Sequence, residues 1–355
     1  MRRAAAVPPA SRRAGFPWPA LALYFLSPVV GELLSSASPP VEFFSAFGLT
    51  VMSLLYGCGA LLVRELAFRW GTGWPGRLLL GAAYGIVEEG LMVKSFFDPG
   101  WPDLGVLGTY GRIAGVNWVW SVELTLYHCF YSICIPILLV ELAFPRWRER
   151  RWLKAPGLAA VGAMLAADVV FGFAWLTRYR PPLVPYLGAW AATAGLVVAA
   201  WRVRLPAGPV RFAPQRAPEP RRVPGPHALP FFLFGFACTL LFFALTWALP
   251  SSRLVPPLAT IALVAGVAVG FVAGLRELVR TFGWTAPNQW ALASGALAFF
   301  VAFSSVVELD ASRTDDPRGM RVVGLVAAAL LLAGFLWVRG RERAGPRRNG
   351  ERLRG

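Results

Sequence analysis

The chain alternates long apolar runs with short polar or basic segments over most of its length. Ten runs stand out, each close to the ~20 residues that a helix needs to cross the hydrocarbon core of a bilayer. They cover approximately residues 18–36, 44–63, 77–96, 117–144, 155–176, 183–201, 230–249, 255–275, 288–307 and 321–338. Backbone polar groups in lipid must be satisfied within their own segment, so runs of this length predict helices. The pattern therefore predicts an all-α, polytopic transmembrane bundle of about ten spans.

Composition and charge agree with this class. Hydrophobic residues make up 56% of the 355 positions and charged residues only 15%, whereas soluble domains average about 25% charged residues. The net charge of +16 could indicate nucleic-acid binding, but the basic residues lie in alternate loops. If the N-terminus is cytoplasmic, 27 of the 35 Lys and Arg residues fall in cytoplasmic segments and 8 in outer loops, as the positive-inside rule describes. We expect an integral protein of the cytoplasmic (inner) membrane with both termini in the cytoplasm and no nucleic-acid partner.

A stretch rich in Pro and Arg divides the chain into two membrane bundles. Such a composition is typical of a flexible connection. The predicted order is an N-terminal bundle of about six spans, a cytoplasmic linker, a C-terminal bundle of about four spans and a basic cytoplasmic tail, at residues 1–203, 204–229, 230–340 and 341–355.

The second bundle is predicted to be a scaffold. Its four runs carry no acidic residue, Lys or His in their interiors. Gly266, Gly270 and Gly274 share one helix face, and small residues at this spacing allow helices in lipid to approach closely. We expect this face to pack tightly or to form an oligomer.

Four ionisable residues of the first bundle lie deep inside apolar runs: Glu88, Glu89, His128 and Asp168. Insertion of each costs roughly 2.5–3.5 kcal/mol, so such groups face the bundle interior and mark functional sites. From their positions along each run, at ~1.5 Å per residue, they lie near one common depth. Three helices are therefore expected to present them to one cavity. Interhelical hydrogen bonds between protonated carboxyls would explain the same positions without a function.

Further polar residues lie around these four. We expect Glu123, Lys94, Asn117 and Ser132 to support the site, although polar contacts between helices would account for them equally well. Two other acidic residues are expected to form ordinary ion pairs. Glu65 is predicted to pair at the surface with neighbouring arginines, and Glu141 to pair with Arg146 or Arg148.

The segment from Glu88 to Asp168 resembles the CAAX-protease and bacteriocin-processing family of intramembrane metalloproteases. That family places Glu-Glu-x-x-x-Arg on one transmembrane helix and Phe-x-x-x-His on a later one. Here Glu88-Glu89 precedes Lys94, a basic residue one position later than in the family, and His128 follows with Leu124 in place of Phe. The family also has a second membrane histidine, in a His-x-x-x-Asn or His-x-x-x-Asp motif. The remaining histidine of this chain, His227, lies in the linker, and Asp168 would take the missing position.

The resemblance implies a metal-dependent hydrolase. Glu88 or Glu89 would be the general base, with His128 in the catalytic group, while His128, Glu89 and Asp168 would hold a divalent ion such as Zn²⁺. The substrate would be a membrane-embedded peptide. Two other functions fit the same residues: a transporter or permease in which they relay protons or bind a small ion, and a non-catalytic membrane scaffold whose partner is the lipid bilayer.

Overall fold

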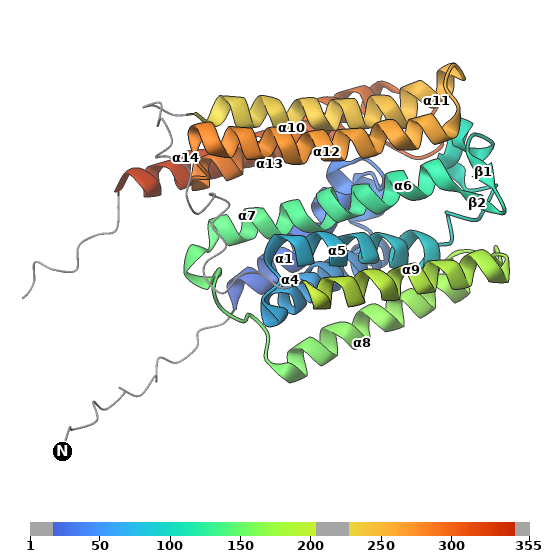
Figure 1. Ribbon diagram of the computed structural model, residues 1–355, viewed down its shortest axis with the longest axis horizontal. Helices are drawn as coiled ribbons and strands as arrows, with labels where there is room; N and C mark the ends of the chain where they lie inside the picture. The colour runs from blue at the N-terminus through green and yellow to red at the C-terminus, as the bar shows by residue number, and fades with distance from the viewer. Residues whose placement is uncertain (1–16, 204–226, 345–355) are drawn as a thin grey trace, which may run out of the picture.

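The computed structural model describes residues 17–203 and 227–344 (Figure 1). They form a helical bundle with one small hairpin, β1 (Arg112–Ile113) and β2 (Val116–Asn117), in the segment between Met92 and Trp118. The helices are α1 (Trp18–Pro28), α2 (Pro40–Phe43), α3 (Ala46–Met52), α4 (Cys58–Trp70), α5 (Gly73–Ile86), α6 (Trp118–Tyr127), α7 (Ile135–Ala143), α8 (Ala155–Phe171), α9 (Leu183–Arg202), α10 (Ala228–Phe243), α11 (Leu249–Ser252), α12 (Pro257–Phe282), α13 (Ala286–Leu309) and α14 (Met320–Ala344). Short 3₁₀ segments lie at Pro102–Gly108 and Pro145–Trp147.

Several helices join end to end through a π-helical turn and form longer rods. Within the described residues, eight rods are long and apolar enough to cross a membrane. These are Ala46–Trp70, Trp118–Ala143, Ala155–Leu176, Leu183–Arg202, Ala228–Ser252, Pro257–Phe282, Ala286–Leu309 and Met320–Ala344. This confirms the all-α polytopic membrane class.

Two of the ten predicted spans are not among these eight rods. The first is the shorter apolar rod Trp18–Leu34. The other is α5 with its π-helical continuation to Met92, which carries Arg77, Glu88 and Glu89 among its apolar residues. The count of ten and the side on which each terminus lies stay predictions. Most of the predicted linker and tail lies outside the described residues.

The two halves of the chain form two groups of helices in contact. In Figure 1, α10, α12, α13 and α14 lie along the top, and α4, α5, α8 and α9 lie below. The rod of α6 and α7 runs between them and contacts α12 and α13 on one side and α1 and α5 on the other. Helix α5, whose continuation carries the two glutamates, is thus packed against α4, α6 and α9.

Glycines bring α10 and α13 into close contact. A Cβ on Gly295 would lie 1.9 Å from the carbonyl oxygen of Phe232, and one on Gly235 would lie 2.3 Å from that of Leu292. The predicted glycine face of α12 behaves differently. A Cβ added to Gly266 or Gly270 would meet nothing within 4 Å, whereas one on Gly274 would meet the Phe234 ring. At Gly266 and Gly270 the face is not used within the described chain, and its role in an oligomer stays a prediction.

A buried ion network closes the end of the bundle where α4, α5 and α7 meet the loop after α7. Glu141 accepts from both terminal nitrogens of Arg77, at 2.8 and 2.7 Å, and from Arg64 Nε at 3.3 Å. Arg64 also donates to Glu65 at 2.6 Å, and both side chains are fully buried. Glu65 thus pairs with its neighbouring arginines as expected, but the expectation of a surface pair is wrong, because the Arg64–Glu65 pair is buried. The expected partner Arg148 does approach Glu141, at 3.7 Å, but Arg77 is the closer one.

Candidate functional site

Four of the π-helical turns meet at one place in the first bundle. A π turn inserts an extra residue into a helix, is rare and often occurs at functional sites. Each turn here continues a helix without a break in helical backbone angles. They carry Glu32, Tyr56, the Glu88–Glu89 pair and His128, in the segments Val29–Leu34, Ser53–Gly57, Val87–Met92 and His128–Cys134.

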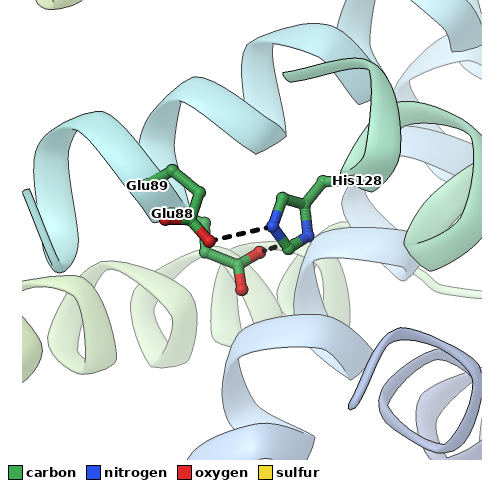
Figure 2. A group of neighbouring side chains, drawn as sticks. All are labelled: Glu88, Glu89 and His128. Carbon is green, nitrogen blue, oxygen red and sulfur yellow. Dashed lines mark hydrogen bonds and ion pairs between the residues drawn. The ribbon is translucent and has the colours of Figure 1, made fainter. Parts of the chain in front are cut away.

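His128 lies between the two glutamates of α5's continuation (Figure 2). Its Nε2 is 3.0 Å from Glu89 Oε1, and its Nδ1 is 3.2 Å from Glu88 Oε2. Ser132, one turn further along, places Oγ 3.1 Å from the same Nδ1. One ligand atom from each of Glu88, Glu89 and His128 lies within 4.8 Å of the other two. The structure thus brings together the carboxylates and the imidazole that the sequence predicts at one depth.

Small residues on α5 make this approach possible. A Cβ on Gly85 would lie 3.1 Å from Thr125 Cα and 3.2 Å from His128 Cβ, and one on Gly81 would lie 3.3 Å from Cys129 Cα. The two helices therefore pack at short backbone separation, as small residues permit in membrane bundles. A larger side chain at Gly85 would push His128 away from the glutamates.

The Glu89 carboxylate is fixed by a hydroxyl and an indole. Ser95 donates its hydroxyl to Glu89 Oε2, and Trp120 Nε1 donates to Ser95 Oγ at 3.0 Å. Ser95 follows Lys94, whose backbone has a φ of +66° and turns the chain back after the helix. The turn places Ser95 beside the carboxylate six residues before it. Neither Ser95 nor Trp120 can be assigned to the site from the sequence, because the contacts of Ser95 with Glu89 and of Trp120 with Ser95 depend on this turn.

A third carboxylate lies behind a tyrosine that contacts the histidine. Glu32 accepts from the Tyr56 hydroxyl and, at 2.7 Å, from Ser38 Oγ. The Tyr56 ring is 5.9 Å from the His128 ring, centroid to centroid, and is fully buried. Glu32 is visible in the sequence as an acidic residue near the end of its apolar run, but nothing there places it beside His128.

A residue of the second bundle forms a hydrogen bond with the turn that follows Glu32. Arg313, in the loop between α13 and α14, donates to the carbonyl oxygen of Ser36 at 3.0 Å and pairs with Asp315. The hydrogen bond from Arg313 lowers the pKa of the Asp315 carboxyl, so that side chain stays ionised at neutral pH and keeps the guanidinium in place. The C-terminal half thus contacts the edge of the site.

Charge balance sets the chemistry of this cluster. Glu32, Glu88 and Glu89 contribute three carboxyl groups, against one imidazole. Within the described part of the chain, no Lys or Arg forms an ion pair with any of them. Buried charges are costly unless they are paired or bind a metal. The excess carboxylates must therefore carry protons or share a bound cation.

Asp168 does not join this group, contrary to expectation. It is buried on α8, but the cluster of ligand atoms contains only Glu88, Glu89 and His128 among the described residues. Its Oδ2 has no hydrogen-bond partner in the described residues. The position of Asp168 along its helix predicts correctly that the side chain is buried. It does not predict that the side chain lies apart from the Glu88, Glu89 and His128 ligand atoms.

Three of the four expected supporting residues serve other contacts. Lys94 Nζ donates to the carbonyl oxygens of Phe173 and Thr177, at 2.7 and 3.1 Å, and so closes the end of the α8 rod. Asn117 caps α6 by accepting from Trp120 N at 3.0 Å. Glu123 accepts from Trp247 Nε1 at 2.5 Å, across the boundary between the two bundles. Of the four, Ser132 alone contacts His128 within the described chain.

A family model matches residues 21–342, almost the whole described chain. The chain belongs to an uncharacterised membrane protein family. This corrects the resemblance to the CAAX-protease and bacteriocin-processing family, because the model that matches is a different one and covers both bundles. The departures at Lys94 and at the missing second histidine agree with that correction.

One curated relative is an uncharacterised protein from Archaeoglobus fulgidus. The present chain is 30% identical to it over 126 residues, which is 35% of the chain and 38% of the relative. The chain thus matches well under half of that protein. No solved structure matches the chain.

Proposed function

We propose that this membrane protein binds a divalent metal ion, Zn²⁺ in the first instance, through Glu88, Glu89 and His128, and uses it to hydrolyse a substrate within the membrane. The observation that supports the proposal is the convergence of these three side chains from two π-helical turns, with ligand atoms within 4.8 Å. The excess of carboxylates over cationic side chains at this buried site supplies the negative charge that a divalent ion would neutralise.

The donor types fit such an ion. Zn²⁺ takes His nitrogen and Glu oxygen at ~2.0–2.2 Å, and its catalytic sites use three protein ligands and keep one position open. Ligand atoms at these bond lengths and tetrahedral angles lie about 3.5 Å apart, so the present spread of up to 4.8 Å would have to contract by about 1 Å on binding. With His128 Nε2 as the ligand, Ser132 Oγ is positioned to accept from Nδ1–H. Such a contact fixes the tautomer and orientation of a ligating histidine.

The chain's own residues supply the remaining parts of a hydrolytic site. A bound divalent ion would polarise a carbonyl group and lower the pKa of a water molecule. Glu32 is not needed as a ligand, and the hydroxyls of Tyr56 and Ser38 orient its carboxylate. Tyr56 lies between Glu32 and His128, so Glu32 would accept a proton released at the site by way of the Tyr56 hydroxyl. Ser95 and Trp120 hold Glu89 in its ligand position.

A proton-coupled transporter is the second candidate, and one arrangement favours it. Carboxyl, phenol and imidazole groups follow one another from Glu32 through Tyr56 to His128 and Glu89. Such a series can pass protons without any metal, as ionisable residues in membrane proteins often do. The two functions differ in whether the site takes up a divalent ion.

Metal binding to the intact protein tests the proposal. The full chain, purified in detergent and stripped with a chelator, is titrated with Co²⁺, whose visible absorption reports coordination, and then with Zn²⁺ in competition. We expect about one ion per chain with the spectrum of a four- or five-coordinate N/O site. Asp168→Asn, buried but outside the cluster, should bind equally well. Absence of stoichiometric binding would reject the metal site and leave the proton relay.

We also propose that the chain crosses the cytoplasmic membrane ten times, with both ends in the cytoplasm. The proposal rests on the division of basic residues among the loops. Reporter fusions at residue 224, in the linker between α9 and α10, and after residue 355 should both report a cytoplasmic location. A fusion at Asp316, in the loop between α13 and α14, should report the opposite side. An external C-terminus would contradict this topology.

A further inference from the structure

An apolar cavity of about 400 Å³ lies between the two bundles. Its wall comes from α5, α6 and α7 on one side and from α10, α12 and α13 on the other. Leu126, Phe130, Phe242, Phe271 and Ala296 are representative lining residues. The volume falls in the ~300–1,000 Å³ range of pockets that hold small ligands. An empty apolar space of this size would forgo the dispersion contacts of its lining, so the cavity favours an apolar occupant.

One end of the cavity is basic and aromatic. Arg276 lines it together with Trp74 and Trp284, and Trp is the residue that membrane proteins place at the lipid headgroup level. Arg276 is exposed and enters no ion pair with the other described side chains, whereas Arg280, one turn later, pairs with Glu277. A free guanidinium at the mouth of an apolar cavity favours an amphiphile with an anionic head.

The surface of α12 beside the cavity is apolar as well. Ala268, Val269, Val272 and Ala273 form it, next to Arg276. Ala268, Val272 and Arg276 also line the inner cavity. The cavity and the apolar surface of α12 therefore adjoin each other and share Arg276.

We propose that this place binds an anionic diacyl phospholipid of the surrounding bilayer. One acyl chain occupies the cavity between the bundles, the other lies along the apolar surface of α12, and the headgroup phosphate pairs with Arg276. Basic pockets between transmembrane helices bind anionic lipid headgroups in this way. The lipid fills the gap beside α12, and so joins the second bundle to the first. This site is separate from the Glu88–Glu89–His128 cluster and does not depend on its function.

The test measures lipid binding to the full chain in detergent. Dioleoyl phosphatidylglycerol and dioleoyl phosphatidylcholine have the same acyl chains and differ in headgroup charge, and native mass spectrometry counts each lipid bound. We expect tighter binding of phosphatidylglycerol. Arg276→Ala should weaken that binding about fivefold. It should weaken phosphatidylcholine binding less, because the choline cation offsets the charge of that lipid's phosphate. Arg202→Ala, at the exposed end of α9, is the matched control and should change neither.

Filling the cavity tests the acyl-chain part separately. Ala268→Trp on α12 and Ala296→Phe on α13 introduce bulk from two different helices of the second bundle, and each should reduce binding of both lipids. The second variant serves if the first fails to fold, as judged by circular dichroism and size-exclusion chromatography. Equal binding of the two lipids by the unmodified protein, or undiminished binding by both filled variants, would overturn the proposal.

Discussion

Replacing His128 with Ala should abolish stoichiometric metal binding while the helical bundle stays folded. The imidazole is the one nitrogen donor in the cluster that the described residues form, and it contacts both glutamates. Without it two adjacent carboxylates remain, which repel each other and offer only oxygen donors. We expect affinity for Zn²⁺ to fall by more than the ~10–100-fold that loss of an outer hydrogen-bond partner causes. Titration followed by inductively coupled plasma mass spectrometry measures the loss, and circular dichroism checks the fold.

A graded series makes this result specific to the site. Ser95→Ala removes the hydroxyl that orients Glu89 but leaves all three donors, so its affinity should fall by about 10–100-fold, less than that of His128→Ala. Asp168→Asn should bind as the unmodified protein does. If His128→Ala retained a full equivalent of ion with unchanged affinity, the metal would lie elsewhere and the assignment of these ligands would be incorrect.

The membrane class and the core of the site can be predicted because both depend on position along the chain. Apolar runs of ~20 residues have few alternatives to helices in lipid. Buried charges face the bundle interior, so Glu88, Glu89 and His128 are expected at one depth and do meet. Asp168 shows the limit of this reasoning. A helix turns about 100° per residue, so a residue at the correct depth can still face a different neighbour.

The remaining residues of the site cannot be predicted, because they depend on tertiary structure. A π-helical turn has no signature in one sequence, yet four such turns set the directions of Glu32, Tyr56, Glu88 and His128. Glu32 reaches the site only because α1 packs beside the helix that carries Tyr56.

The ion network at the other end of α5 escapes prediction for a related reason. Adjacent charges such as Arg64 and Glu65 are usually solvated, and no feature of the sequence indicates that the loop after α7 covers them. In the structure Arg64 donates to the carbonyl oxygens of Arg148 and Arg150, at 2.8 and 2.7 Å, and its guanidinium stacks 3.9 Å from the Trp152 ring centroid. The loop thus seals the network from water.

Glu141→Ala should therefore destabilise the protein strongly. The Glu141 carboxylate is fully buried and is the partner of Arg77, whose side chain is 9% exposed, and its loss would leave that guanidinium buried without a counter-charge. Breaking a buried pair in this way costs ~3–5 kcal/mol. Glu277→Ala, which removes the partner of Arg280 at an exposed position, should have little effect. Unfolding of both variants in detergent, followed by circular dichroism, measures the difference. Equal stability of the two variants would show that the network is solvated and that the loop after α7 does not close over it.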